Sequence, residues 1–254
     1  MSILLSNDDG INSEGFAVLE DIATALGGEV WAVAPEQDRS GLAHSLTQLK
    51  PLRPRQLGPR RFALRGTPAD CVIVPIREPM PQPPDLILSG VNSGVNIADD
   101  IIYSGTIGAT IEGALFGIPS VAMSQHYEFT GGERRFHRGV SRPMAPRLIR
   151  RLLSLPHVDG TFYSINFPHC RLDELQPPRV VAQSRRAHGY QVDRRLDGRD
   201  FPYFWLRAVH PKTDYMPGND AEAMVHNALS IPALKIDLTD RAQNRRLLDL
   251  FPAG

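Results

Sequence analysis

The chain has 254 residues, of which 42% are hydrophobic, so it can form one large α/β domain or a domain with an appendage. Its 28 basic and 28 acidic residues give a formal net charge of zero. That balance argues against a nucleic-acid polymer as a partner. The two cysteines, Cys71 and Cys170, stand in no metal or redox spacing, and no signal sequence or membrane span is recognisable. We therefore expect a cytoplasmic protein without a membrane partner.

The first predicted strand, residues 3–5, is a short apolar run that leads at once into Asp8 and Asp9. Apolar residues then recur at helical spacing up to residue 26, and two glycines follow as a stop. Strand, acidic turn and helix form the opening unit of an α/β sheet, which binds ligands at the carboxyl ends of its strands. Adjacent carboxylates there repel each other unless a divalent cation lies between them. The competing interpretation is a solvated loop that caps the helix.

The chain continues as alternating strands and helices. Further strands are predicted at residues 30–34, 62–64, 85–89, 120–124 and 163–167. Further helices are predicted at residues 71–76, with Thr67 as N-cap, and at residues 106–116 and 143–155. Residues 42–52 are ambiguous, and the Pro- and Arg-rich segment 51–61 is expected to be a surface connection. This order predicts an α/β fold with a mostly parallel sheet flanked by helices.

The sequence pattern changes near residue 179. Residues 189–199 form a charged, turn-rich segment. It is followed by an aromatic strand at residues 201–206, a helix at 220–229, a strand at 230–236 and an amphipathic helix at 240–250. We divide the chain into a catalytic core, residues 1–178, and a C-terminal extension, residues 179–254, whose strand and helix return to the core. Exposed aromatic hairpins of this kind pair with another subunit, or else pack on their own domain as a lid.

Polar loops follow three of the predicted strands. They carry Asp8 and Asp9, then Ser40, then Asn92. If these strands are neighbours, the loops meet at one edge of the sheet and gather hard oxygen ligands. Without an accompanying Cys or His, that set suits Mg²⁺ or Mn²⁺ better than zinc.

A helix begins at Ser104, Gly105 and Thr106, where backbone N–H groups and hydroxyls favour an anion. A metal beside a helix N-terminus is one way to hold a phosphoryl group. The simpler interpretation is ordinary N-capping by Ser104 and Thr106, and turn formation by Asn92 and Asn96.

Several stretches, in this order, closely resemble the SurE family of survival proteins: residues 3–10, 35–41, 66–72, 89–96 and 103–106. The match continues to about residue 125 and, more loosely, to residue 238. These proteins are divalent-metal-dependent 5′-nucleotidases. The resemblance implies a Rossmann-like core with a C-terminal hairpin and helix extension used in oligomerisation, as a homodimer or homotetramer.

The resemblance also implies site residues. One divalent metal ion would be held by Asp8, Asp9, Ser40 and Asn92. The substrate phosphate would be held by Asn96, Ser104, Gly105 and Thr106. The implied reaction is hydrolysis of nucleoside 5′-monophosphates to nucleoside and phosphate, and some relatives also act on 3′-nucleotides or short polyphosphate. Asp8 and Asp9 are the expected catalytic residues, with Asp8 activating water or attacking phosphorus. His44 and His126 are candidates for the general acid.

The sequence departs from the family pattern at His44 and at residues 227–234, where the family usually has a Gly-Tyr-x-Ser-x-Thr-Pro-Leu strand. Two alternatives to an enzyme fit the sequence less well. A receiver-type signalling domain needs an Asp at the end of its middle strand, but here that strand ends in Ser89. A non-catalytic nucleotide-binding module needs a Gly-rich first loop, but this first loop is acidic.

Overall fold

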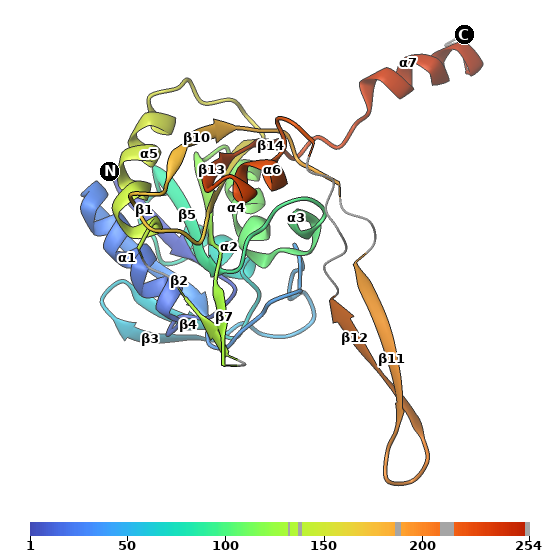
Figure 1. Cartoon of the computed structure of the whole chain (residues 1–254). Coiled ribbons are helices and arrows are strands. Elements are labelled where there is room, and N and C mark those ends of the chain that lie inside the picture. Colours follow the sequence, from blue (N-terminus) through green and yellow to red (C-terminus); the bar gives the residue numbers. More distant parts are fainter. Residues whose placement is uncertain (132, 137–138, 186–188, 209–215, 252–254) are drawn as a thin grey trace.

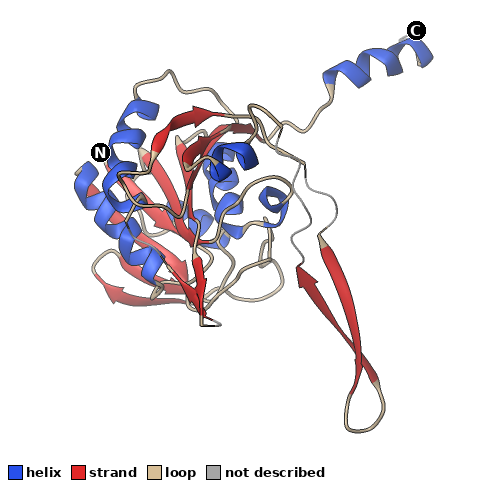
Figure 2. Cartoon of the chain, in the orientation of Figure 1, coloured by secondary structure: helices blue, strands red, loops and turns tan. Residues whose placement is uncertain are grey.

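A mixed sheet runs through the body of the molecule (Figures 1 and 2). The computed structural model describes residues 1–131, 133–136, 139–185, 189–208 and 216–251. The strands of the sheet are β1 (Ser2–Ser6), β2 (Glu29–Pro35), β3 (Pro54–Gly58), β4 (Arg61–Leu64), β5 (Leu86–Ser93), β6 (Ser120–Gln125), β9 (Thr161–Phe167), β10 (Gln176–Val180), β13 (Ala228–Ile231) and β14 (Ala233–Lys235). The helices are α1 (Glu14–Leu26), α2 (Asp70–Arg77), α3 (Asp100–Tyr103), α4 (Gly105–Leu115), α5 (Ser141–Leu153), α6 (Asp220–Val225) and α7 (Arg241–Leu250). Two hairpins lie outside the sheet, β7 (Glu128–Thr130) with β8 (Glu133–Arg135) and β11 (Tyr190–Leu196) with β12 (Pro202–Ala208).

Strand β1 is central, with β2 and then β4 on one side and β5, β6 and β9 on the other, all parallel. The chain therefore winds outward in both directions from the boundary between β1 and β5. A switch point of this kind leaves a crevice at the carboxyl ends of the two strands, where α/β proteins bind their ligands. The predicted mostly parallel, Rossmann-like sheet is confirmed.

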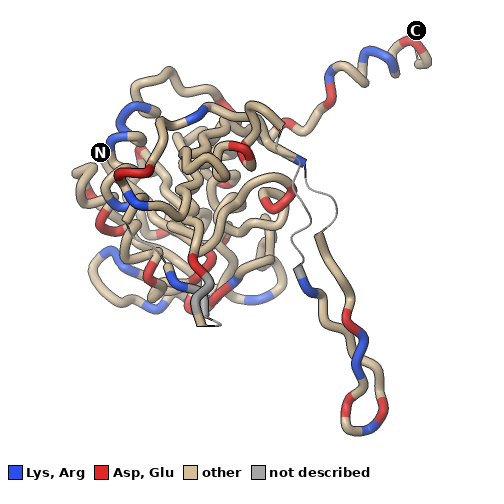
Figure 3. Tube along the Cα trace, viewed as in Figure 1, with Lys and Arg blue, Asp and Glu red and all other residues tan. Residues whose placement is uncertain are grey.

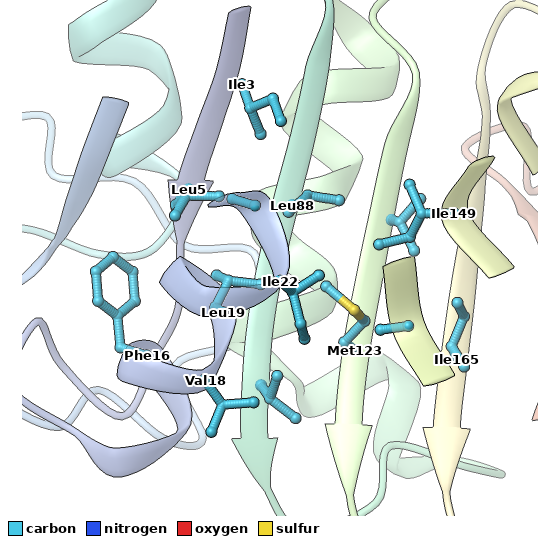
Figure 4. Packing of buried hydrophobic residues seen from close by; sticks show 14 of the residues in the cluster. Ile3, Leu5, Phe16, Val18, Leu19, Ile22, Leu88, Met123, Ile149 and Ile165 are labelled. Atoms are coloured by element: carbon cyan, nitrogen blue, oxygen red, sulfur yellow. The ribbon is translucent and has the colours of Figure 1, made fainter. Parts of the chain in front are cut away.

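Helices cover both faces of this sheet because the side chains of β1 alternate between them. Ile3 and Leu5 pack beneath α1 and α5, as Figure 4 shows, whereas Leu4 joins the cluster under α2 and α4. All three are fully buried. Each contributes about 1.5–3 kcal/mol relative to an exposed position. Apolar burial on both faces thus fixes β1, and with it the start of the acidic turn.

Helix α1 has a defined cap at each end. The Ser13 hydroxyl accepts a hydrogen bond from the Phe16 N–H at 3.2 Å, and Gly27 ends the helix with a φ of 80°. Gly15 lets the first turn lie against β5, because a Cβ atom there would be 1.9 Å from the Val91 carbonyl oxygen. The absence of a side chain at residue 15 therefore sets the approach of α1 to the end of β5.

Gly15→Ala should lower the free energy of unfolding by about 1–3 kcal/mol, since overpacking exceeds the gain in helix propensity of about 1 kcal/mol. Urea unfolding measures the change. The control is Gly58→Ala, because a Cβ there meets only Arg61 Cβ at 3.6 Å. A Gly15→Ala protein as stable as the wild type would contradict this packing.

Some predicted boundaries are wrong, each for a local reason. Part of the expected surface connection is β3, an edge strand antiparallel to β4, whose residues are mostly exposed and therefore give no apolar pattern. The ambiguous stretch 42–52 forms no strand. Helix α2 begins at Asp70, although the Thr67 hydroxyl still accepts from the Asp70 N–H at 3.2 Å. The expected strand 230–236 is divided at Pro232 into β13 and β14, both paired with β9. Helix α6 ends at Val225, earlier than expected.

The hairpin of β11 and β12 and the helix α7 project away from the body (Figure 1). Phe204, Trp205 and Leu206 on the hairpin are exposed, as are Leu248 and Phe251 at the end of the chain. Basic and acidic residues are interspersed along the chain (Figure 3), in keeping with the neutral overall charge. No helix among the described residues is long and apolar enough to cross a membrane.

Candidate functional site

Asp8 lies two residues beyond the end of β1, at the switch point of the sheet, and is buried. Its Oδ1 accepts the Thr106 hydroxyl at 2.7 Å, and its Oδ2 accepts the Thr106 N–H at 3.3 Å. Thr106 is in the first turn of α4, so the acidic turn and the helix N-terminus are in direct contact. Two regions that are 98 residues apart therefore form one polar cluster.

Gly105 makes this contact sterically possible. A Cβ atom at residue 105 would lie 2.9 Å from Asp8 Cβ, 3.1 Å from Asp8 Oδ2 and 2.9 Å from Pro68 Cγ. The helix start can therefore press against Asp8 only with glycine at this position. Ser104 is the N-cap of α4, since its Oγ accepts the Ile107 N–H at 3.1 Å. The capping interpretation is thus confirmed for Ser104, whereas the Thr106 hydroxyl is directed to Asp8.

Burial raises the pKa of the Asp8 carboxyl above its ordinary value of 3.8, the bonds from Thr106 lower it, and the charge of Asp38 raises it further. No cationic side chain is among the described groups that act on this pKa. A buried carboxylate without a positive partner is destabilised in its charged form. The surroundings of Asp8 therefore favour a bound cation that would neutralise its charge.

Asp9 and Asn92 are joined through the end of β5. The Ser93 N–H donates to Asp9 Oδ2 at 3.0 Å, which draws the second carboxylate of the turn toward this strand. The Asn92 amide nitrogen donates to the Gly94 carbonyl at 2.7 Å, so its amide oxygen is the remaining ligand atom. The predicted meeting of the β1 and β5 loops is therefore present in the structure.

The loop after β2 reaches the same turn through its backbone. The Arg39 N–H donates to the Asp8 carbonyl at 2.7 Å. Ser40 follows directly, is exposed, and has its own N–H bound to Asp38 Oδ1 at 2.7 Å. The backbone thus brings this loop beside Asp8.

Asn96 is buried on the other side, toward β6 and β9. Its amide donates to Ser124 Oγ at 2.8 Å, and its backbone N–H and carbonyl are both held by the side chain of Asn166. None of the hydrogen bonds described for Asn96 reaches Asp8 or Thr106. Sequence reasoning did not identify Asn166 or Ser124 as supports of this loop. The available signal was the polar residue Asn166 inside the apolar predicted strand 163–167, because a buried polar side chain needs a hydrogen-bond partner.

The acidic turn has its own support, which sequence reasoning also missed. The Asn7 amide donates to the Gly10 carbonyl at 3.0 Å and to Ser13 Oγ at 2.9 Å, while its Oδ1 accepts the Gly10 N–H at 3.1 Å. Gly10 has a φ of 99°, a conformation that glycine adopts readily. Asn7 therefore fixes the turn that presents the two carboxylates.

The two histidines considered as general acids make their described contacts with other residues. His44 Nε2 is 2.5 Å from Oε1 of the buried Glu112, on α4. His126 is exposed and lies near the rings of Tyr127 and His169. Neither has a described contact with Asp8. The structure gives His44 a clear partner that ties its loop to α4.

Among the described residues, no three His, Cys, Asp or Glu side chains gather in a way that could hold a metal ion. A metal at the acidic turn would therefore depend on neutral oxygens as well as on Asp8 and Asp9. The hydroxyl of Ser40 and the amide of Asn92 are such oxygens, and hard cations such as Mg²⁺ accept mixed sets of this kind.

Comparison with known proteins gives consistent results. The family model described as survival protein SurE matches residues 3–190. A 5′-nucleotidase SurE of Brucella anthropi is 50% identical over 239 residues, covering 94% of this chain and 93% of the relative. One of Brucella abortus (strain S19) is 49% identical over 239 residues, covering 94% of each. The crystal structure of a SurE protein from Aquifex aeolicus aligns with a TM-score of 0.84 and 31% identity, over 99% of this chain and 100% of that chain.

Proposed function

This chain belongs to the SurE family, and from that premise we propose that it hydrolyses nucleoside 5′-monophosphates to nucleoside and phosphate. Its relatives in Brucella are named 5′-nucleotidases. The observation that carries the proposal is the buried Asp8 carboxylate, bonded to Thr106 at the start of α4 and paired with no described cationic side chain. A signalling or purely nucleotide-binding role is not favoured, because neither accounts for this arrangement.

We propose that Asp8, Asp9, Ser40 and Asn92 hold one divalent cation, Mg²⁺ or Mn²⁺. When bound, such an ion neutralises phosphate charge and polarises a P–O bond. The support is the chemistry of the donors, two carboxylates and two neutral oxygens, which matches hard cations. Asp8 and Asp9 are also the proposed catalytic residues.

The phosphate would lie at the N-terminus of α4. Backbone N–H groups of the first turn and the hydroxyls of Ser104 and Thr106 face an anion favourably there. Gly105 allows close approach of the backbone. Asn96, which Ser124 and Asn166 hold toward β6 and β9, is the remaining proposed phosphate contact. As the equatorial oxygens gain charge in the reaction, donors at the start of α4 would stabilise them. Thr106, whose hydroxyl donates to Asp8 in this structure, would turn that hydroxyl to the phosphate.

Asp8 is the proposed reacting carboxylate, either as the base that takes a proton from water or as the group that attacks phosphorus. Trapping of a phospho-aspartyl enzyme would establish direct attack. Labelled oxygen that enters phosphate only from water, with no trapped species, would favour the base. Both routes use the position that Thr106 fixes by its two hydrogen bonds.

The exposed hairpin and α7 are proposed to join copies of the chain into a homodimer or homotetramer. The aromatic and aliphatic side chains that they expose support this assignment. We also propose that the chain divides into a catalytic core of residues 1–178 and an extension of residues 179–254. The proposed location is the cytoplasm.

A phosphate-release panel of nucleotides, with and without EDTA, tests the function. We expect release from 5′-AMP by the wild type, loss of release in EDTA, and its recovery with excess Mn²⁺. Asp9→Asn should lower kcat/KM by about a hundredfold or more, because it removes one charged ligand while keeping the shape of the side chain. Activity that survives both EDTA and Asp9→Asn would contradict the metal site.

A further inference from the structure

A cleft of about 670 Å³ lies between the loop of residues 39–51 and the chain that leads into α2. Its lining includes Leu42, Leu46, Leu49 and Pro51, and three cationic residues, Arg39, Lys50 and Arg65. Arg65 also pairs with Glu36, with Nε 3.0 Å from Oε2. Pockets that bury small ligands measure about 300–1,000 Å³, so the cleft is large enough for a nucleoside.

The cleft adjoins the proposed phosphate site at two points. Arg39, at one margin, donates its backbone N–H to the Asp8 carbonyl. Thr67, at the other, precedes Pro68, whose ring would be 2.9 Å from a Cβ atom at residue 105. When the phosphate of a substrate lies at the start of α4, the remainder of that substrate can therefore reach into this cleft.

The loop that forms the outer wall is held at several points along its length. The Ala43 N–H donates to the Tyr103 carbonyl at 3.2 Å, His44 contacts Glu112, and the Thr47 N–H donates to Asp70 Oδ1 at 3.1 Å. Between these anchors Leu42 and Leu46 remain 41% and 44% exposed. The wall is thus fixed in place while it presents apolar side chains to the cleft.

Two further cavities lie elsewhere. One of about 230 Å³ is lined by Val33, Phe62 and Val74. The other, of about 240 Å³, is lined by Pro119, Leu152 and Tyr163. Neither includes a residue of the acidic turn, its neighbours or the start of α4. Of these three cavities, the larger cleft alone combines adjacency to the site, apolar walls and positive charge.

We propose that this cleft holds the base of the nucleotide substrate, with Leu42 and Leu46 packed against the face of the ring. The assignment rests on the proposed nucleotidase function and deepens it. A planar base has apolar faces that leucine side chains cover, and polar edges that remain at the open side. Arg39, Lys50 and Arg65 raise the local concentration of an anionic ligand and steer it into the cleft.

The test compares 5′-AMP with ribose 5-phosphate, which has the same sugar and phosphate but no base. In the double variant Leu42→Ala/Leu46→Ala, the KM for 5′-AMP should rise roughly tenfold, since each truncation removes apolar contact with the ring. The KM for ribose 5-phosphate should stay unchanged. Leu46→Met should keep the KM for 5′-AMP close to the wild-type value. The matched control is Leu172→Ala, at an exposed position outside the cleft lining.

Lys50→Ala adds an independent readout. It should lower kcat/KM for both substrates alike, and the difference should shrink as ionic strength rises, because screening weakens steering. Equilibrium dialysis of 5′-AMP with each variant measures binding even without turnover. Equal effects of the leucine substitutions on both substrates, or no effect on either, would overturn the assignment of the base. A wild type that binds 5′-AMP through these leucines without releasing phosphate would contradict the nucleotidase function alone.

Discussion

Asp8→Asn should lower kcat/KM for 5′-AMP by about a thousandfold or more and, at the same time, make the metal-free protein more stable at neutral pH. The loss of activity follows because the amide neither accepts a proton nor attacks phosphorus, and reactions lose about 10²–10⁴-fold without their general base. The gain in stability follows because the substitution removes a buried negative charge for which no described cation compensates.

Burial raises the pKa of Asp8, so the folded protein binds this proton more tightly than the unfolded chain does. The wild type therefore loses stability as the pH rises from about 4 through the folded-state pKa, whereas the asparagine variant does not. The stability difference between the two should widen across that window.

Urea unfolding in EDTA at several pH values measures this difference. At neutral pH the variant should be more stable by roughly 1–2 kcal/mol, which is within the range of a typical single stabilising substitution. Below about pH 4 the difference should vanish, since the carboxyl is then neutral in both states. A variant that is less stable than the wild type at neutral pH would contradict an uncompensated charge on Asp8.

Gly105→Ala should lower kcat by about a hundredfold while leaving the fold intact, because a displacement of about 1 Å at a reacting group costs that much. The added Cβ would lie 2.9 Å from Asp8 Cβ and from Pro68 Cγ, closer than side chains normally pack. Either Asp8 or the start of α4 must shift. Alanine is the better helix former, by about 1 kcal/mol, which offsets part of the steric cost to stability.

Steady-state kinetics on 5′-AMP and circular dichroism separate the two effects. The control is Gly198→Ala, since a Cβ there meets no atom within 4 Å. It should match the wild type in both measurements. A fully active Gly105→Ala enzyme would mean that the close contact between α4 and Asp8 has no part in catalysis.

Much of the fold could be predicted because its central strands are apolar and short. Residues 3–5 and 85–89 pattern as buried strands, and the alternation with helices fixes their parallel direction. The exposed edge strand β3 and the strand β10 carry no such pattern. Their pairing depends on neighbours far along the chain, which no local signal identifies.

The candidate site was predictable in its residue types but not in its contacts. The position of Asp8 follows from the strand before it, and that of Thr106 follows from the helix it begins. The bond between them spans 98 residues and appears only once the strands are ordered. The same holds for His44 with Glu112 and for Asn166 with Asn96, where the second partner comes from a distant element.

Binding of Mn²⁺ to the wild type and to Asp8→Asn, followed by electron paramagnetic resonance, tests whether the acidic turn holds a cation. A cation there would neutralise the buried carboxylate of Asp8 and the neighbouring carboxylate of Asp9. The wild type should bind a single Mn²⁺ per chain, and the variant should bind it more weakly by at least about tenfold. Equal binding by both proteins, or no binding by the wild type, would contradict a cation site at the acidic turn.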